Sequence, residues 1–588
     1  MHKRLLGLLT AAAIIAAACG PAATTSAPPA SGPPASVDPG ASAPPASGGL
    51  AAEQVIRIAL PGEPPTLDPN VAQDANSLAV LRALHRPLVY IDKDMQVVDA
   101  LAESHEISAD AKTLTFTLRD AKYSNGDPIV AADLVYSWKR LVDPRTAAPY
   151  NYTIKEVAGA EELLAMGGAD PAIPDAEVDA ALEKLGVAAP DDKTFVVTLA
   201  SPATYFLSAM TLWVGVPIQE KWITSEGATE AANYVSSGPF MLDTWDHNSQ
   251  IILKPNPNWY GDVKPTLTEI QMPMYAEPAA AQAAYETDEV DIIMPVASED
   301  VPRVQADPVM GAEFVSDPQL GNVYYNFNNG NDPTGKKRLA RCAEDKACPT
   351  TNKNFRIALT QAIDKQTFLD TTFAGLGQVA NSFVQPGLGG YDESINPYPY
   401  DLTAAQAAMD LALSELGFAS AAEIPPLKFG FNTGGGHEPR VAFLAEAWRT
   451  AFGLETEQIG SEFGVFLTQR TAGEYDIARN GWGADYPHAN NQLDGLFTCG
   501  GGNNDQQWCN EEFDSLLQQA AAEPDVAKQN ELYVQAQTIM ADEAASLFLL
   551  FPARPALVKP YVTGLTKTPM DSTSPGEHFY ETMQILEH

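Results

Sequence analysis

The alternation of apolar and polar side chains predicts a chain of short strands interspersed with helices. Residues 56–60 and 114–118 alternate strictly, which is the period of a strand with one buried face. Over residues 131–138 the apolar side chains recur every three or four positions, which predicts a helix. The same periodicity predicts helices over 403–417, with Thr403 as N-cap and Gly417 near the end, and over 438–452. This mixture predicts an α/β fold, although the pattern does not determine the strand order.

One stretch, residues 475–486, begins as a strand and then breaks. Two glycines flank Trp482, and glycine lets a backbone leave a sheet edge or approach another group closely. Arg479, Trp482 and Asp485 place a cation, a large aromatic face and an anion within a few positions. That combination suits a ligand with both charges and apolar surface; the alternative is a strand that ends in an ordinary polar turn.

The N-terminus has the pattern of an export signal. Two basic residues precede an apolar run at 5–18, which is too short to span a bilayer comfortably. Small residues lead into Cys19, as in a bacterial lipobox, although Ala16 stands where that pattern usually has Leu. The sequence therefore predicts a signal peptide at 1–18 and a lipid on Cys19, with an ordinary cleaved signal peptide as the alternative.

Residues 20–52 are almost entirely Pro, Ala, Ser, Gly and Thr. Such a segment cannot bury enough apolar surface to fold, so residues 19–52 are expected to form a lipidated, disordered tether. A flexible coil of this length spans on the order of 30 Å. A globular body beginning near residue 53 would then be held at the outer face of the cell membrane, or in the periplasm.

Length and charge narrow the possibilities further. At 588 residues the chain exceeds one hydrophobic core, so two or three domains are expected. The 75 acidic residues outnumber 36 basic ones, giving a formal net charge of −39. A field of that sign repels phosphates, so nucleic acid is excluded as a partner.

The cysteines agree with export. Besides Cys19 there are two local pairs, Cys342 with Cys348 and Cys499 with Cys509. In an oxidising compartment, two local disulfides are the simplest reading. A metal site is the alternative, but neither pair has the two-residue spacing of zinc ligands and the histidines show no ligand spacing. No metal or cofactor is therefore expected.

Residues 99–144 carry a family resemblance. They run from Asp-Ala-Leu-Ala-Glu-Ser through Leu-Arg-Asp-Ala-Lys-Tyr-Ser-Asn-Gly to Val-Tyr-Ser-Trp-Lys-Arg-Leu-Val-Asp-Pro. This is similar to the signature region of the extracellular solute-binding proteins of ABC importers, in the oligopeptide, dipeptide and nickel class. Further similar blocks lie at 237–245, 256–260, 352–368 and 403–417. One departure is the lack of a Gly in the turn at 288–290.

The resemblance implies a three-domain α/β binding protein with two main lobes that close at a hinge. The discontinuous lobe I is expected at 53–90, 211–322 and 548–588, an inserted domain II at 91–210, and lobe III at 323–547.

The resemblance also implies an anchor for a peptide amine. Oligopeptide binders of this class carry an acidic residue in a Trp-x-Ala-Asp-Tyr run, and the similar run here ends in Asp485-Tyr486. A buried ammonium needs a compensating anion, which Asp485 would supply. The alternative is an Asp that caps a turn.

Other site residues follow from the same resemblance. His437, Arg470 and Arg479 fall where similar proteins hold the peptide carboxylate, although each alone could equally be a surface or ion-pair residue. Aromatic walls are expected from Trp482 and, more weakly, from Tyr150 and Phe463, with core packing as the alternative.

The function implied is binding without catalysis. A monomeric lipoprotein would enclose an oligopeptide between its lobes and deliver it to membrane permease subunits. Within the family, the alternatives are a dipeptide, a nickel chelate, haem or an oligosaccharide. A secreted hydrolase or a sensor lipoprotein is the alternative from another class. The sequence contains neither a Gly-x-Ser-x-Gly nor a His-Glu-x-x-His run to support a hydrolase.

Overall fold

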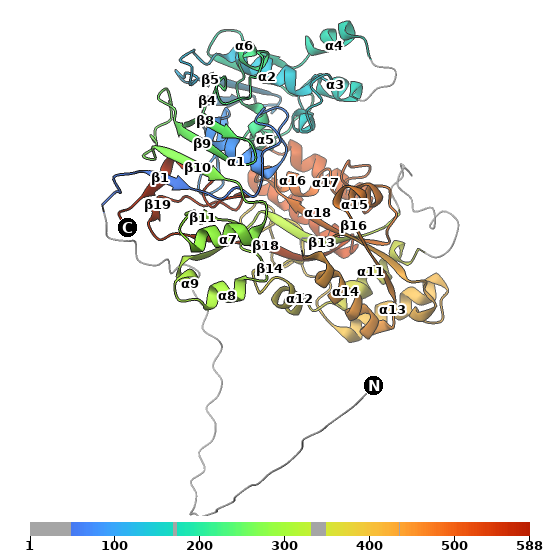
Figure 1. Cartoon of the computed structure of the whole chain (residues 1–588). Helices are drawn as coiled ribbons and strands as arrows, with labels where there is room; N and C mark the ends of the chain where they lie inside the picture. The colour runs from blue at the N-terminus through green and yellow to red at the C-terminus, as the bar shows by residue number, and fades with distance from the viewer. Residues whose placement is uncertain (1–48, 168–172, 331–347, 434–435) are drawn as a thin grey trace, which may run out of the picture. The chain divides into compact units, whose positions relative to one another are not determined.

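Strand β18 (Ser546–Val558) lies inside the largest sheet of the computed structural model (Figure 1). The structure describes residues 49–167, 173–330, 348–433 and 436–588, all within one unit that begins at Pro45. The eight-stranded sheet has the order β11 (Ile292–Ile293), β18, β13 (Gly321–Phe327), β17 (Ile477–Gly483), β15 (Leu427–Asn432) and β16 (Thr456–Ser461). Strands β12 (Phe314–Pro318) and β14 (Gly377–Val379) also pair with β18.

Helices cover both faces of this sheet, which explains its long apolar runs. Neighbouring residues of one strand point to opposite faces, so Tyr325 packs with one core cluster and Tyr324 with another. The first face is covered by α11 (Lys353–Gln361), α12 (Lys365–Thr372), α13 (Leu402–Leu416) and α14 (His437–Phe452). The second is covered by α16 (Ala489–Leu493), α17 (Glu511–Ala522) and α18 (Val526–Asp542). Helix α15 (Phe463–Thr471) packs against Tyr475 and Ala478.

The segment 91–210 contains a complete sheet of its own. Its four strands have the order β4 (Ala102–Ile107), β5 (Thr113–Leu118), β7 (Thr194–Thr198) and β6 (Val187–Ala188). The strand predicted at 114–118 is therefore present as β5. Its helices are α2 (Ala131–Val142), η1 (Asn151–Ile154), α3 (Ala160–Met166), α4 (Asp175–Leu182) and α5 (Phe206–Ala209).

A further four-stranded sheet joins the N-terminal strand to the middle of the chain. Its order is β1 (Val55–Arg57), β10 (Glu269–Pro273), β9 (Gln250–Pro255) and β8 (Phe240–Asp246). Two-stranded sheets are formed by β2 (Val89–Ile91) with β3 (Val97–Asp99), and by β19 (Val562–Thr563) with β20 (Gln584–Ile585). The remaining helices are α1 (Ala75–Leu84), η2 (Trp213–Gly215), α6 (Glu220–Ile223), α7 (Pro278–Glu286), α8 (Val301–Ala306), α9 (Met310–Glu313), η3 (Pro349–Thr351), η4 (Ala421–Glu423) and η5 (Tyr580–Thr582).

The predicted domain boundaries stay a prediction. The whole β4–β7 sheet lies inside 91–210, but β18 crosses the boundary expected between residues 547 and 548. The signal peptide, Cys19, most of the tether and Cys342 lie outside the described residues. Within the described ranges, no helix combines the length and hydropathy that crossing a bilayer requires.

Two local predictions can be compared with the observed backbone. The N-cap of α13 is Asp401 and not Thr403, because the Asp401 side chain accepts hydrogen bonds from the backbone N–H groups of Thr403 and Ala404. The helix thus begins two residues earlier than predicted. At its other end Gly417 has φ +80°, the left-handed conformation typical of a terminating glycine, as predicted.

The Gly238 signature position has a structural role. A Cβ placed on Gly238 would lie 2.7 Å from the backbone nitrogen of His85, and the Gly238 N–H donates to the carbonyl of Leu84. Only glycine permits that approach between α1 and the start of β8. Gly238 therefore serves the packing of the scaffold.

Candidate functional site

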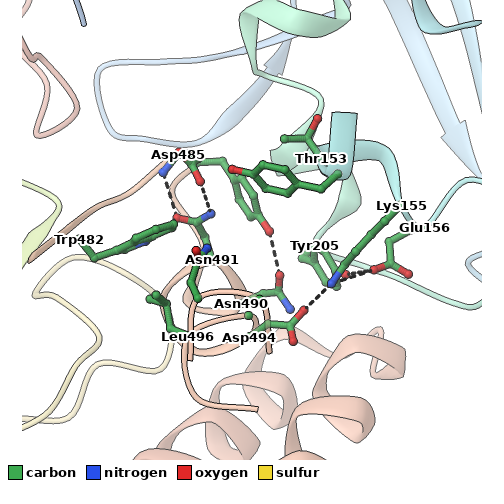
Figure 2. Close-up of a pocket in the computed structure, with 15 residues that line it drawn as sticks. Thr153, Lys155, Glu156, Tyr205, Trp482, Asp485, Asn490, Asn491, Asp494 and Leu496 are labelled. Carbon is green, nitrogen blue, oxygen red and sulfur yellow. Dashed lines mark hydrogen bonds and ion pairs between the residues drawn. The ribbon is translucent and has the colours of Figure 1, made fainter. Parts of the chain in front are cut away.

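Strand β17 ends where a cavity of about 430 Å³ opens. β17 lies between β13 and β15 in the large sheet, and Gly483 faces Gly321 on β13. The next N–H, that of Ala484, donates to the carbonyl of Leu320, after which the chain leaves the sheet. Figure 2 shows the result: Trp482, Asp485 and α16 line one side of the cavity, and Thr153, Lys155, Glu156 and Tyr205 line the other.

Asp485 is held by two neutral side chains. Its carboxylate accepts hydrogen bonds from the Tyr150 hydroxyl at 3.3 Å and from Asn491 Nδ2 at 3.1 Å. Burial raises the pKa of Asp485 to about 6, although these two hydrogen bonds act in the opposite direction. Within the described ranges, no Lys, Arg or His forms an ion pair with this carboxylate. Asp485 is therefore a desolvated anion without a compensating cation.

Asn491 fixes the geometry of two predicted site residues at once. Its Oδ1 accepts from the backbone N–H of Asp485 at 2.9 Å and from Trp482 Nε1 at 3.2 Å, while its Nδ2 donates to the Asp485 carboxylate. Asn491 lies on α16, six residues after Asp485, and belongs to no recognisable motif. The sequence alone therefore does not indicate it.

Tyr150 acts differently from the expectation that it walls the pocket. It lies just before η1, and its ring packs 4.9 Å from that of Trp213 and 5.4 Å from that of Tyr152. Its hydroxyl reaches Asp485, whereas Tyr152 and Tyr205 supply the aromatic lining on this side of the cavity. The structure thus brings Asp485, Trp482 and Tyr150 together.

Arg470 and Arg479 have different surroundings. Arg470 forms an ion pair of 2.9 Å with Asp505 and donates to Asn480 Oδ1. Arg479, on β17, donates from Nε to Asn432 Oδ1 at 2.6 Å, and its guanidinium lies 5.4 Å from the Phe466 ring. Burial, and then the charge of Arg470, lowers the pKa of Arg479 to about 10. In the part of the chain that the structure describes, no carboxylate forms an ion pair with Arg479.

His437 and Phe463 lie close to Arg479. His437 is the first residue of α14, and burial followed by the charges of Arg479 and Arg440 lowers the pKa of His437 to about 4. His437 is therefore neutral at pH 7 and offers a hydrogen bond in place of a charge. Phe463 begins α15, is 50% exposed, and its ring lies 5.8 Å from the Arg479 guanidinium.

Arg440 is a cation of this group that the sequence analysis missed. It follows His437 by three positions on α14, so both project from the same side of the helix. Its guanidinium lies 4.0 Å from the Phe373 ring centroid, and its charge lowers the pKa of both His437 and Arg479. The helical spacing from His437 was the available signal.

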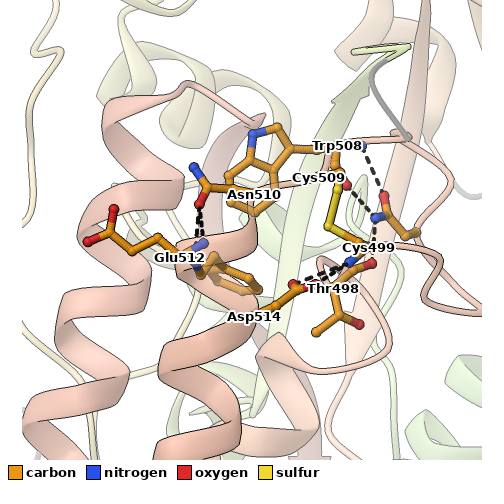
Figure 3. The surroundings of a disulfide bond; sticks show 9 residues. Thr498, Cys499, Trp508, Cys509, Asn510, Glu512 and Asp514 are labelled. Carbon is orange, nitrogen blue, oxygen red and sulfur yellow. Dashed lines mark hydrogen bonds between the residues drawn. A yellow bond between two sulfur atoms is a disulfide. The ribbon is translucent and has the colours of Figure 1, made fainter. Parts of the chain in front are cut away.

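The predicted disulfide Cys499–Cys509 is present (Figure 3). The backbone N–H of Cys499 donates to the Asp514 carboxylate, which ties the loop to α17. The loop supplies Gly502 and Asn503 to the cavity wall and Asp505 to Arg470. Cys348 is disulfide-bonded, but Cys342 lies outside the described residues, so that pairing stays a prediction.

A buried cluster of Asp571, Glu577 and His578 has the composition of a metal site. Its acceptors are already used within the protein: Glu577 pairs with Arg82, and Asp571 lies 2.9 Å from His578 Nδ1. The backbone N–H groups of Thr573 and Ser574 also donate to Glu577. We interpret the cluster as a structural hydrogen-bond network.

Comparison with known proteins gives consistent matches. Residues 96–504 match the family model of bacterial extracellular solute-binding proteins, family 5. The oligopeptide-binding protein OppA of Bacillus subtilis is 30% identical over 502 residues, covering 83% of this chain and 86% of the relative. Haemophilus influenzae OppA, solved in complex with the peptide RPPGFSPFR, superimposes with a TM-score of 0.71 at 26% identity, covering 92% of this chain and all of that one.

A further structure supports the fold alone. The unliganded open form of the periplasmic murein tripeptide-binding protein MppA matches with a TM-score of 0.74 at 24% identity, over 92% of this chain and 99% of that one. Together these likenesses confirm the predicted periplasmic-binding-protein-like α/β fold.

Proposed function

This chain belongs to the bacterial extracellular solute-binding proteins of family 5, the binding components of ABC peptide importers, and on that premise we propose that it captures oligopeptides by their amino end at Asp485. The family consists of binding proteins, which agrees with the prediction that the chain is not an enzyme.

The observation that carries the proposal is the environment of Asp485. Its carboxylate is partly withdrawn from water, accepts hydrogen bonds from two neutral side chains, and faces the cavity. A buried charge without a counter-ion costs free energy, and a ligand ammonium removes that cost while contributing charge-assisted hydrogen bonds. A neutral sugar or a metal chelate has no ammonium to offer.

The other end of the peptide is assigned to Arg479. Asp505 already balances the charge of Arg470, so Arg470 positions its surroundings more than it attracts a ligand. Arg479 keeps its charge at pH 7, with Asn432 and aromatic rings around it. His437 adds a neutral donor or acceptor, and Phe463 an exposed apolar face. Trp482 and Tyr205 would wall the space along the peptide.

Transport then follows from closure. The two main lobes would close over the peptide and bring segment 91–210 against segment 323–547. Permease subunits would then recognise the surface of the closed form and accept the ligand. ATP hydrolysis belongs to other subunits. The lipid on Cys19 and the tether would keep the monomeric body beside the permease at the outer face of the membrane.

The proposal can be tested by native mass spectrometry. The purified protein is mixed with a pool of free-ended peptides three to six residues long, and separately with the same pool acetylated at the amino ends. We expect bound peptides from the first pool and strongly reduced binding from the second. Equal binding of both pools, cleavage of the peptides, or a co-purifying sugar, haem or metal chelate as the sole ligand would overturn the proposal.

A further inference from the structure

Segment 91–210 touches segment 323–547 through side chains on both sides of the cavity. The Tyr150 hydroxyl reaches Asp485, and the ring of Tyr205 is parallel to that of Tyr486 at 6.5 Å. The backbone N–H of Thr204 donates to the carbonyl of Ala521. These contacts join the two segments directly, so the approach of one segment to the other has stabilising interactions of its own.

One of these contacts is an ion pair. Lys155 Nζ lies 3.0 Å from the Asp494 carboxylate, and both residues line the cavity (Figure 2). Among the ion pairs between described residues, it is the one that joins 91–210 to 323–547; the other ion pairs of 91–210 stay within that segment or reach residues 68, 221 and 262. The Lys155 and Asp494 side chains are 47% and 28% exposed.

The neighbouring residues hold the pair in place. Glu156 follows Lys155 and accepts a hydrogen bond of 2.7 Å from the Tyr205 hydroxyl, so the backbone on this side of the cavity is fixed to Tyr205. On the other side, the Asp494 N–H donates to the carbonyl of Asn490 at the end of α16. Since α16 also carries Asn491, the pair and the Asp485 anchor are connected through one short helix.

A partly exposed ion pair within one rigid lobe contributes little to stability. Between two segments that move apart, the same pair acts on the equilibrium between the open and closed states and not on folding. Opening separates Lys155 from Asp494, while Glu156, 3.8 Å from Lys155 Nζ, stays beside it in the same segment. The interaction with Asp494 therefore favours the closed state. A bound peptide leaves through the open state, so the population of that state controls its release.

We propose that Lys155 and Asp494 form a latch that holds segment 91–210 against segment 323–547 and prolongs the residence of a bound peptide without recognising either of its ends. The inference rests on the proposed peptide-binding function for its kinetic consequence. Its structural part, that the pair favours closure, concerns the ligand-free protein and stands independently.

The test uses charge reversal and exchange. Lys155→Glu and Asp494→Lys each break the pair. The double variant, called the exchange variant, restores the pair with the two charges exchanged. The ligand-free arm measures the distance distribution between nitroxide labels at Ala176→Cys on α4 and Ala407→Cys on α13, two exposed positions. Each single variant should shift this distribution toward longer distances, and the exchange variant should shift it back.

The kinetic arm uses the peptide most enriched from the free-ended pool. Each single variant should raise its dissociation rate roughly twofold to fivefold, the scale of one partly exposed ion pair, and the exchange variant should recover most of the wild-type rate. The association rate should change less. If Lys155 or Asp494 contacted the peptide directly, the exchange variant would not recover, and its dissociation rate would stay above the wild-type rate.

The chain offers a matched control pair. Lys353 and Glu543 also lie 3.0 Å apart, with side chains 43% and 35% exposed, but both belong to segment 323–547. Lys353→Glu should change neither the distance distribution nor the dissociation rate. Unchanged distances in both Lys155→Glu and Asp494→Lys would overturn the latch, as would an exchange variant that does not recover. If the wild type bound no peptide at all, the proposed function would be wrong. The distance measurement on the ligand-free protein would still show whether the ion pair favours closure.

Discussion

At the scale of single residues, the proposed binding role of Asp485 sets binding against stability. Its pKa of about 6 in the folded protein lies above the ordinary value of 3.8. The folded state therefore binds this proton more readily than the unfolded chain. The ionised carboxylate costs stability at pH 7, and that cost disappears as the pH falls through 6 toward the ordinary value. A bound ligand ammonium would remove the same stability cost while the carboxylate stays ionised.

Asp485→Asn separates the two effects. The amide removes the buried charge and keeps a hydrogen-bonding side chain for Tyr150 and Asn491. We expect peptide binding to weaken by about 1.5–3 kcal/mol, while the unfolding temperature of the ligand-free protein rises. Isothermal titration calorimetry and thermal unfolding measure the two changes. Unaltered affinity would show that Asp485 does not hold the peptide.

The same residue predicts the pH dependence of binding. Only the carboxylate form attracts an ammonium, so affinity should be highest near pH 7 and fall below pH 6, approaching tenfold per pH unit. Affinity should also begin to fall near pH 8, because a peptide amino end loses its proton with a pKa of about 8. His437 does not titrate in this window, because burial lowers its pKa to about 4. Dissociation constants measured between pH 5 and 8 test the profile. Asp485→Asn is the control and should give a much flatter curve.

At the scale of elements, β17 and the disulfide loop 499–509 together carry residues of both ends of the proposed site. β17 carries Arg479 near its middle and delivers Asp485 past its end. The loop places Asp505 on Arg470 and two residues on the cavity wall. Because Cys499 and Cys509 join the ends of this loop, the disulfide restricts the backbone that positions Asp505.

Replacing both cysteines by serine should therefore affect stability and binding together. The closed loop is short, so we expect the free energy of unfolding to fall by about 2–3 kcal/mol. Peptide affinity should also fall, because a mobile loop no longer holds Asp505 against Arg470. Urea denaturation and calorimetry measure the two effects. A stability loss with wild-type affinity would show that the loop acts on the fold alone.

At the scale of the whole molecule, the body and the N-terminal segment are predicted to have separate tasks. The body would enclose the ligand, and the acidic formal net charge of the chain, −39, disfavours binding to phosphates and anionic lipid headgroups. If the chain is anchored as predicted, its membrane affinity would come from the lipid on Cys19, since one or two acyl chains supply affinity that such a body lacks.

Cys19→Ala tests this division. Expressed with its own leader in a bacterial host, the wild type should fractionate with membranes, and its mature N-terminus should be Cys19 with the mass of attached acyl chains. The variant should be found mainly in the soluble fraction and bind peptides with unchanged affinity. The Cys499→Ser/Cys509→Ser variant is a control that should stay with membranes. A soluble wild type would favour an ordinary cleaved signal peptide.

Local patterns in the sequence determined the local features of this protein. Alternation predicted β5 and the strand that became β17, and the glycines around Trp482 marked where that strand ends. The Trp-x-Ala-Asp-Tyr run singled out Asp485 before any contact was known. The local pattern did not determine the N-cap of α13, which is Asp401 and not Thr403.

Only the tertiary structure decided which residues meet. Tyr150 and Asp485 are separated by 335 positions, and Lys155 and Asp494 by 339. In the sequence, Arg470 and Arg479 are equivalent candidate cations, and only the fold shows that Asp505 pairs with Arg470. Hydrophobic periodicity reports the burial of each residue along its own strand or helix. Which distant elements pack together depends on strand order and lobe closure, so partners, counter-ions and shifted pKa values emerge only from the folded molecule.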